Sequence, residues 1–186
     1  MPAPYRRYID WLQDENRVNG TDFWKTYLAG IEEPSYVSLA RDLSGYEYTT
    51  HQLTASLSQH LSSTAKQNQV TLNSLLQAAW GLLLTRYKSD HQSSNIMFGM
   101  TSAGRPTDLS GAQEMLGLFI NTLPVRLEPE LNGSVQQYLQ TVQVNQVEVR
   151  DYEHVSLAQI QSMSDIDNGQ ALFDSLLVFE LSLIHI

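Results

Sequence analysis

The side chains of this sequence most suited to act on a bound molecule begin where an apolar stretch ends. Residues 95–101 have the apolar alternation of a β-strand, and Ser102, Gly104, Arg105 and Pro106 follow directly. The small glycine and the φ-restricted proline let the backbone approach a ligand closely. The spacing therefore predicts a loop between two strands, with Ser102, Gly104 and Arg105 as candidate site residues. For Arg105, pairing with a carboxylate or a loop carbonyl is the favoured alternative.

A second strand-like stretch carries two polar side chains among apolar neighbours. Residues 118–127 are apolar except for Asn121, Thr122 and a terminal arginine, Arg126. Burying an unpaired amide or hydroxyl group costs about 1–3 kcal/mol, so these groups need partners. Two interpretations stand: Asn121 and Thr122 orient a bound molecule, or they satisfy neighbouring backbone at a bulge or strand edge. Arg126, at the strand end, is expected to be solvated or ion-paired.

The elements around these residues alternate between helix and strand. Apolar periodicity predicts helices at residues 5–13, 21–28, 56–68 and 71–88 and a further helix from residue 134. Strands are predicted at residues 48–55, 95–101, 118–127 and 173–180, the last of them buried. Capping-box patterns start at Ser56, Ser134 and Ser156. The alternation predicts an α/β fold, a layered sheet with helices packed on one side.

Composition restricts the class of partner. The net charge of −9 argues against nucleic acid or an anionic membrane surface as the main partner. The absence of cysteine excludes disulfides and thiolate chemistry, which is consistent with the cytoplasm. No apolar run is long enough to span a bilayer. The acidic residues lack metal-ligand spacing, so we expect no metal, and no phosphate-binding or dinucleotide motif is present.

Three motifs together indicate a family. Residues 102–106 (SAGRP) and 117–126 (GLFINTLPVR) closely resemble two motifs of the condensation domains of nonribosomal peptide synthetases. Tyr5, Tyr8 and Trp11 resemble a third, found near the join between the two lobes of those domains. The resemblance implies a two-layer sandwich similar to chloramphenicol acetyltransferase, with a substrate channel between two such lobes. It makes candidate substrate-channel residues of Ser102, Gly104, Arg105, Asn121 and Thr122. We therefore expect one incomplete lobe with a mixed β-sheet and helices packed on one face.

The resemblance also predicts how the chain is divided. Residues 1–35 are expected to be helices from the junction with the N-terminal lobe, and residues 36–180 most of the C-terminal lobe. Residues 181–186 read as the translation of a sequencing adapter, so we expect them to be non-native. The implied partners are peptidyl or aminoacyl carrier domains, the missing N-terminal lobe and an adjacent adenylation domain.

Family members join a carrier-bound acyl or peptidyl thioester to a carrier-bound aminoacyl amine. The substrates travel on phosphopantetheine arms of the carriers, so no directly bound cofactor is expected here. The catalytic His-His-x-x-x-Asp-Gly motif of the family is absent, and the five histidines are isolated in the sequence. His154 is expected to cap or pack. No catalytic residue is therefore assigned, and the fragment alone is not expected to form amide bonds.

Other functions remain open at this point. A non-catalytic docking module of the same fold would bind carrier proteins or tailoring enzymes. An epimerization or cyclization relative would share the fold, although the motif at residues 117–126, with its Asn121-Thr122 pair, favours condensation. An acetyltransferase acting on a free small molecule is disfavoured by the same motifs. The sequence upstream discriminates between the condensation enzyme and the docking module, because an intact histidine motif supports the enzyme and a degenerate one supports docking.

Overall fold

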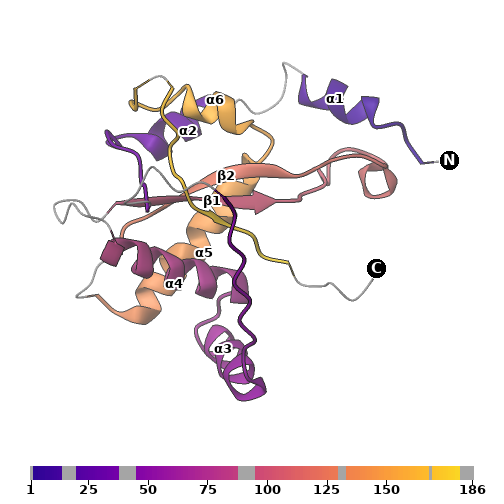
Figure 1. Cartoon of the computed structure of the whole chain (residues 1–186). Coiled ribbons are helices and arrows are strands. Elements are labelled where there is room, and N and C mark those ends of the chain that lie inside the picture. Colours follow the sequence, from indigo (N-terminus) through magenta and orange to yellow (C-terminus); the bar gives the residue numbers. More distant parts are fainter. Residues whose placement is uncertain are drawn as a thin grey trace.

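The computed structural model describes residues 2–13, 20–37, 45–87, 95–129, 133–167 and 169–180. Within these ranges the chain forms helices and three strands (Figure 1). The helices are α1 (Arg6–Leu12), α2 (Thr21–Leu28), α3 (Ala55–Gln67), α4 (Leu72–Tyr87), α5 (Val135–Asp151) and α6 (Leu157–Gln161), with a 3₁₀ turn at Ala112–Glu114. None of the described helices is long and apolar enough to cross a membrane. The predicted non-native tail, residues 181–186, lies outside the described residues.

The strands form a small mixed sheet in the order β2-β1-β3. Strand β1 (Ile96–Ser102) pairs antiparallel with β2 (Asn121–Leu127) and parallel with β3 (Leu176–Leu177). In this register Ser102 lies directly opposite Asn121. The pairing therefore brings the two polar stretches of the sequence together at one end of the sheet.

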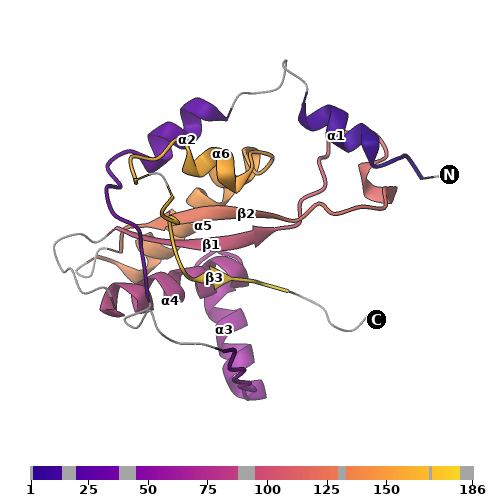
Figure 2. The same ribbon diagram turned by 45° about the horizontal axis from the view of Figure 1, so that its top comes forward.

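Helices cover the sheet, which confirms the predicted mixed sheet with helices, although they lie on both faces of the sheet and not on one alone (Figures 1 and 2). Helix α4 lies on one side of the sheet with α3 beyond it, and α5 packs along α4 (Figures 1 and 2). The short helices α2 and α6 lie on the other side, near β2. Burial of residues 96–100 of β1 without interruption follows from this cover on both faces.

Close packing on the α2 side requires a glycine in β1. A Cβ atom on Gly99 would lie 2.4 Å from the ring of Phe173 and 2.6 Å from the side chain of Leu176. The Phe173 ring therefore packs over Gly99, and Leu176 of β3 lies beside it, only because residue 99 has no side chain. Trp24 of α2 is fully buried on this side of the core.

The strand predicted at residues 48–55 is wrong. Residues 46–54 form no helix or strand, and Tyr46 and Tyr48 are almost fully exposed. No strand among the described residues pairs with this segment, and an unpaired strand is not stable in water. The segment instead leads into α3, whose N-cap is Thr54: its side chain accepts a hydrogen bond from the Leu57 amide at 3.2 Å.

Of the three predicted capping boxes, one is confirmed. Ser156 and Gln159 form the reciprocal pair at the start of α6. Ser134 occupies the N-cap position of α5 but makes no side-chain capping bond. Ser56 lies inside α3, because Thr54 caps that helix two residues earlier. The sequence pattern locates the helix starts to within a turn, but it does not identify the residue that caps.

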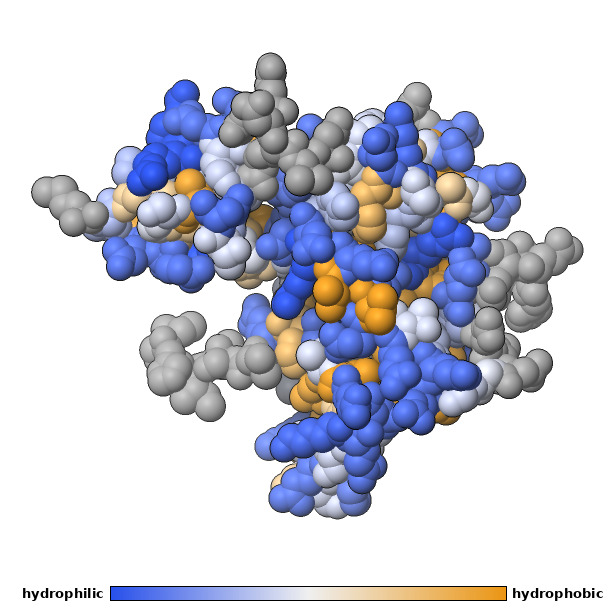
Figure 3. Space-filling model, turned by 180° about the vertical axis from the view of Figure 1, so that it is seen from behind, coloured by the Kyte–Doolittle hydropathy of each residue, from blue (hydrophilic) through white to orange (hydrophobic). Residues whose placement is uncertain are grey.

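Two apolar surfaces are more exposed than their sequences indicate. Helix α4 buries Ser74, Gln77, Ala78, Gly81 and Leu84, whereas its large apolar residues Leu83 and Tyr87 are exposed. The predicted buried strand at residues 173–180 is shorter, because β3 covers Leu176 and Leu177 and Phe173 forms an isolated bridge with Ser35. It is half-exposed at β3. Figure 3 shows apolar side chains gathered in patches among polar ones on the face behind the view of Figure 1.

Candidate functional site

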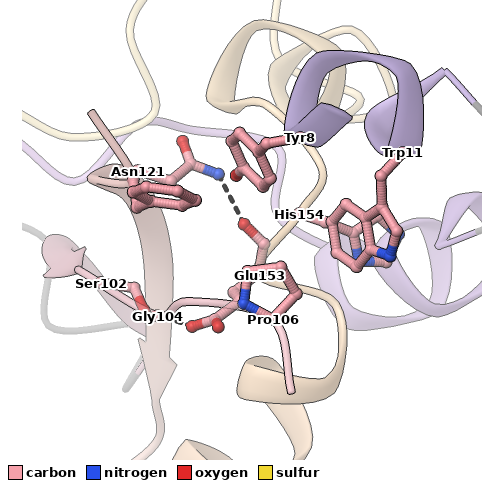
Figure 4. Close-up of a pocket in the computed structure, with 9 residues that line it drawn as sticks. Tyr8, Trp11, Ser102, Gly104, Pro106, Asn121, Glu153 and His154 are labelled. Carbon is pink, nitrogen blue, oxygen red and sulfur yellow. Dashed lines mark hydrogen bonds between the residues drawn. The ribbon is translucent and has the colours of Figure 1, made fainter. Parts of the chain in front are cut away.

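The end of the sheet where Ser102 meets Asn121 borders a pocket (Figure 4). Helix α1, the loop after β1, the start of β2 and the turn between α5 and α6 enclose it. Its lining residues are Tyr8, Trp11, Ser102, Gly104, Pro106, Phe119, Asn121, Glu153 and His154. Three of the five predicted channel residues, Ser102, Gly104 and Asn121, thus lie on one pocket.

The amide of Asn121 is fully engaged with backbone. Its Nδ2 donates to the carbonyl oxygens of Glu153 and Val155, both at 2.8 Å, and its Oδ1 accepts from the Thr122 amide at 2.9 Å. The side chain therefore ties the turn between α5 and α6 to the first residue of β2. The geometry favours the scaffold interpretation of Asn121, although the residue still lines the pocket.

Glu153, which the sequence did not single out, presents the charged group of the pocket. Its Oε2 accepts a hydrogen bond from the Ser102 hydroxyl. A Cβ on residue 104 would lie 1.8 Å from Oε1, so Gly104 makes room for the carboxylate. The carboxylate forms no ion pair with any described residue. In the sequence, only Gly104 indicated that another group comes close to the backbone of the loop after β1.

Aromatic rings form the wall that α1 contributes. The rings of Tyr8 and Phe119 lie 4.6 Å apart, and Tyr8 stacks on Trp11 at 5.6 Å. His154 packs edge-on against Trp11, which agrees with its predicted packing role. The Tyr5 hydroxyl donates to the Leu118 carbonyl. Helix α1 is therefore fastened to the segment that leads into β2.

The two remaining predicted channel residues do not line the pocket. Arg105 donates from Nη1 to the carbonyls of Ala112 and Met115, at 2.5 and 2.6 Å, and lies 4.3 Å over the ring of Phe119. Its guanidinium group orders the loop between β1 and β2, as the alternative interpretation proposed. Thr122 pairs across the strands with Thr101.

The opposite end of β2 holds a closed polar network. Arg126 donates to Asn95, to the carbonyls of Tyr27 and Ala29, and to Glu128, at 2.6–3.1 Å. Its backbone amide donates to the Tyr27 hydroxyl, which donates in turn to Asn145. Burial is the largest influence on this hydroxyl and raises the pKa of Tyr27 to about 12. The predicted ion pair of Arg126 is present, within a structural network.

The pocket can therefore hold and orient a molecule. It offers a carboxylate, a hydroxyl group, aromatic faces and an imidazole. The carboxylate can accept hydrogen bonds from a cationic or neutral donor, and the aromatic faces attract cations or apolar groups. The Asn121 amide gives the pocket rigidity, because its donors are committed to the turn that carries Glu153.

Comparison with known proteins gives a consistent result. The sequence profile of the family described as "Condensation domain" matches residues 1–185. One subunit of the linear gramicidin synthase of Brevibacillus parabrevis is 42% identical over 183 residues, covering 95% of this chain and 4% of that protein. Chondramide synthase of Chondromyces crocatus is 38% identical, over 96% of this chain and 5% of its own length. The chain thus spans a small part of these relatives.

Solved structures share the fold. A four-domain nonribosomal peptide synthetase bound to AMP and glycine superimposes with a TM-score of 0.70 at 20% identity, covering 90% of this chain and 13% of that one. The X-domain from teicoplanin biosynthesis gives a TM-score of 0.67 at 21% identity, over 92% and 39% of the two chains. These likenesses establish the fold that the three motifs predicted.

Proposed function

Because the chain belongs to the condensation-domain family, we propose that the protein it comes from forms an amide bond between two carrier-bound substrates. One substrate is an acyl or peptidyl thioester, and the other is an aminoacyl thioester with a free amine. Residues 36–180 supply the C-terminal lobe, and residues 1–35 supply helices from the junction between lobes. The substrates arrive on phosphopantetheine arms of carrier domains, with an adenylation domain alongside.

The strand register carries the proposal. It places Ser102 opposite Asn121 on the pocket, so the two segments that match the family motifs meet at one place. Both segments fall inside the stretch that is 42% identical to part of a linear gramicidin synthase. A relationship by fold alone would not require the motif residues to converge on one cavity.

The lobe that this chain supplies contributes to the reaction by positioning the two substrates. An α-amino group has an ordinary pKa near 8, so roughly a tenth of it is neutral and nucleophilic at pH 7. Holding that amine near the thioester removes much of the barrier, because the reactants no longer have to find each other in solution. Proton transfer falls to the family's histidine motif, which this chain lacks. The lobe therefore acts with a second lobe that supplies the histidines.

A chimera tests the proposal. Residues 2–180 of this chain replace the aligned segment in the 42% identical linear gramicidin synthase. Both carriers are loaded, and amide formation is followed in a single turnover by mass spectrometry of the carrier-bound product. The expected result is an amide product at a rate within about tenfold of the parent synthetase.

The control distinguishes enzyme from docking module. A parent synthetase that lacks the aligned segment reports whether the lobe is needed at all. A chimera that folds and still binds both carriers but forms no amide would support the non-catalytic docking module instead. The parental histidine motif is present in every arm, so the outcome depends on the lobe from this chain.

A further inference from the structure

The carboxylate of Glu153 is the one charged group of the described pocket that has an unused acceptor. Its Oε2 takes the Ser102 hydroxyl, while Oε1 lies over Gly104 with no hydrogen bond from a described residue. The side chain is half-buried, and no described cation pairs with it. A partly desolvated carboxylate in this state attracts a positively charged group.

The rest of the wall suits the same kind of ligand. The aromatic rings of Tyr8, Trp11 and Phe119 line the pocket together with Glu153 (Figure 4). Aromatic faces attract ammonium and guanidinium groups, most strongly for tryptophan. The pocket therefore combines a carboxylate with a set of rings, which is the chemistry that recognises an organic cation.

Arg105, in the loop that borders the pocket, does not neutralise this site. The Nη1 atom of Arg105 donates to two carbonyls of the loop between β1 and β2, and the guanidinium group lies on the Phe119 ring. Arg105 itself does not line the pocket. Because the guanidinium group of Arg105 bonds within its own loop, the Glu153 carboxylate has no described cation as a partner.

We propose that the pocket beside Glu153 binds a cationic side chain, an ammonium or guanidinium group, of a carrier-bound substrate. This inference rests on the proposed function and adds a substrate class to it. The reacting amine is the less suitable occupant. A carboxylate beside that amine would stabilise its protonated form and raise its pKa, which lowers the fraction able to attack the thioester.

The test is a ligand titration that does not depend on catalysis. The full chain is titrated with Nα-acetyl-lysine methylamide and with Nα-acetyl-norleucine methylamide, which is similar in shape but uncharged. Binding is followed by ligand-observed NMR. We expect the lysine compound to bind about tenfold more tightly, from one carboxylate contact and the aromatic wall. Equal affinities would overturn the proposal without any variant.

Two variants assign the selectivity to the pocket. Glu153→Gln keeps the shape and removes the charge, so the preference for lysine should disappear. Glu148→Gln, at an exposed carboxylate of α5, is the matched control and should leave it unchanged. Near-UV circular dichroism verifies folding, and the comparison of the two ligands on the unaltered chain stands if Glu153→Gln unfolds. A preference that persists in folded Glu153→Gln contradicts the proposal.

Glycine methylamide separates the cationic side chain from the reacting amine. It carries a free α-amine and no side chain. If it binds as tightly as the lysine compound and depends on Glu153, the pocket receives the reacting amine and the proposal is wrong. An inactive chimera that keeps the lysine preference would instead overturn the proposed function and leave the cation site standing.

Discussion

The two ends of β2 treat similar polar residues in opposite ways. At the Arg126 end, the guanidinium group donates to the carbonyls of Tyr27 and Ala29. The Tyr27 hydroxyl and the Asn145 amide bond each other and the backbone of Arg126. At the Asn121 end, the amide is equally engaged, but it holds a turn whose Glu153 carboxylate keeps one oxygen unused. One end closes the fold, and the other presents a charged group to a cavity.

The difference shows what separates a structural polar residue from one that borders a site. A buried network in which every donor finds an acceptor rigidifies the fold and has nothing left for a ligand. A network that ends on an unpaired charge at a pocket still has bonding capacity. The variants below are therefore expected to cost mainly stability at the Arg126 end, and ligand binding as well at the Asn121 end.

The largest loss of stability is expected for Arg126→Met. The change removes four hydrogen bonds and leaves the carbonyls of Tyr27 and Ala29 without a partner, which should lower the free energy of unfolding by about 3 kcal/mol. Urea denaturation measures the loss. Affinity of the folded protein for the lysine compound should not change. A loss of affinity would show that the two ends of β2 are coupled and would contradict the purely structural role of the Arg126 end.

A second effect at the same end depends on pH. The pKa of Tyr27 is raised from 10.0 to about 12, so the folded state holds this proton more tightly than the unfolded state. The associated stability is complete below pH 10 and is lost as the pH rises toward 12. The loss amounts to about 2 kcal/mol. Stability measured across this range should fall more steeply for the unaltered chain than for Tyr27→Phe. Parallel curves would contradict the role of this hydroxyl.

Asn121→Ala sharpens the comparison from the pocket end. Loss of the amide leaves the carbonyls of Glu153 and Val155 unpaired and should cost about 2 kcal/mol of unfolding free energy. In the chimera, an unchanged rate of amide formation with lowered stability would support the scaffold role. A lowered rate in a protein of unchanged stability would instead make Asn121 an orienter of substrate.

The smallest effect concerns the helix that follows the pocket turn. Ser156→Ala removes a side-chain cap from α6 and should cost about 1 kcal/mol. Ser134→Ala is the matched control, because Ser134 holds the N-cap position of α5 without a capping bond and should cost close to nothing. Thermal unfolding of the two variants measures both values. Equal losses would mean that the bonding difference between the two caps has no energetic consequence.

The sequence predicted the parts of the fold that depend on local pattern. Helices α2 and α4 and strand β1 appear within a residue or two of their predicted positions, because each has a strong apolar period or a clear break. The strand at residues 48–55 failed because strand formation needs a partner, which one segment's pattern cannot reveal. The residues of α4 that are buried depend in the same way on distant partners. A Cβ atom on Gly81 would lie 2.7 Å from the side chain of Leu127, so a small residue lies at a close contact there.

The candidate site could be predicted only in part. Ser102, Gly104 and Asn121 could be predicted from the sequence because each differs from its neighbours in residue type. Glu153 was not, since a glutamate near a helix end is ordinary, and only the tertiary contact with Ser102 and Gly104 makes it unusual. The roles of Arg105 and Arg126 likewise required the positions of distant carbonyl groups.

The most direct test of the account is the single-turnover rate of the chimera with lysine or norleucine loaded on the acceptor carrier. We predict amide formation with both substrates, faster with lysine, and loss of that preference in Glu153→Gln. A folded chimera that binds both carriers and yields no amide with either substrate would contradict the claim that this chain forms one wall of a condensation site.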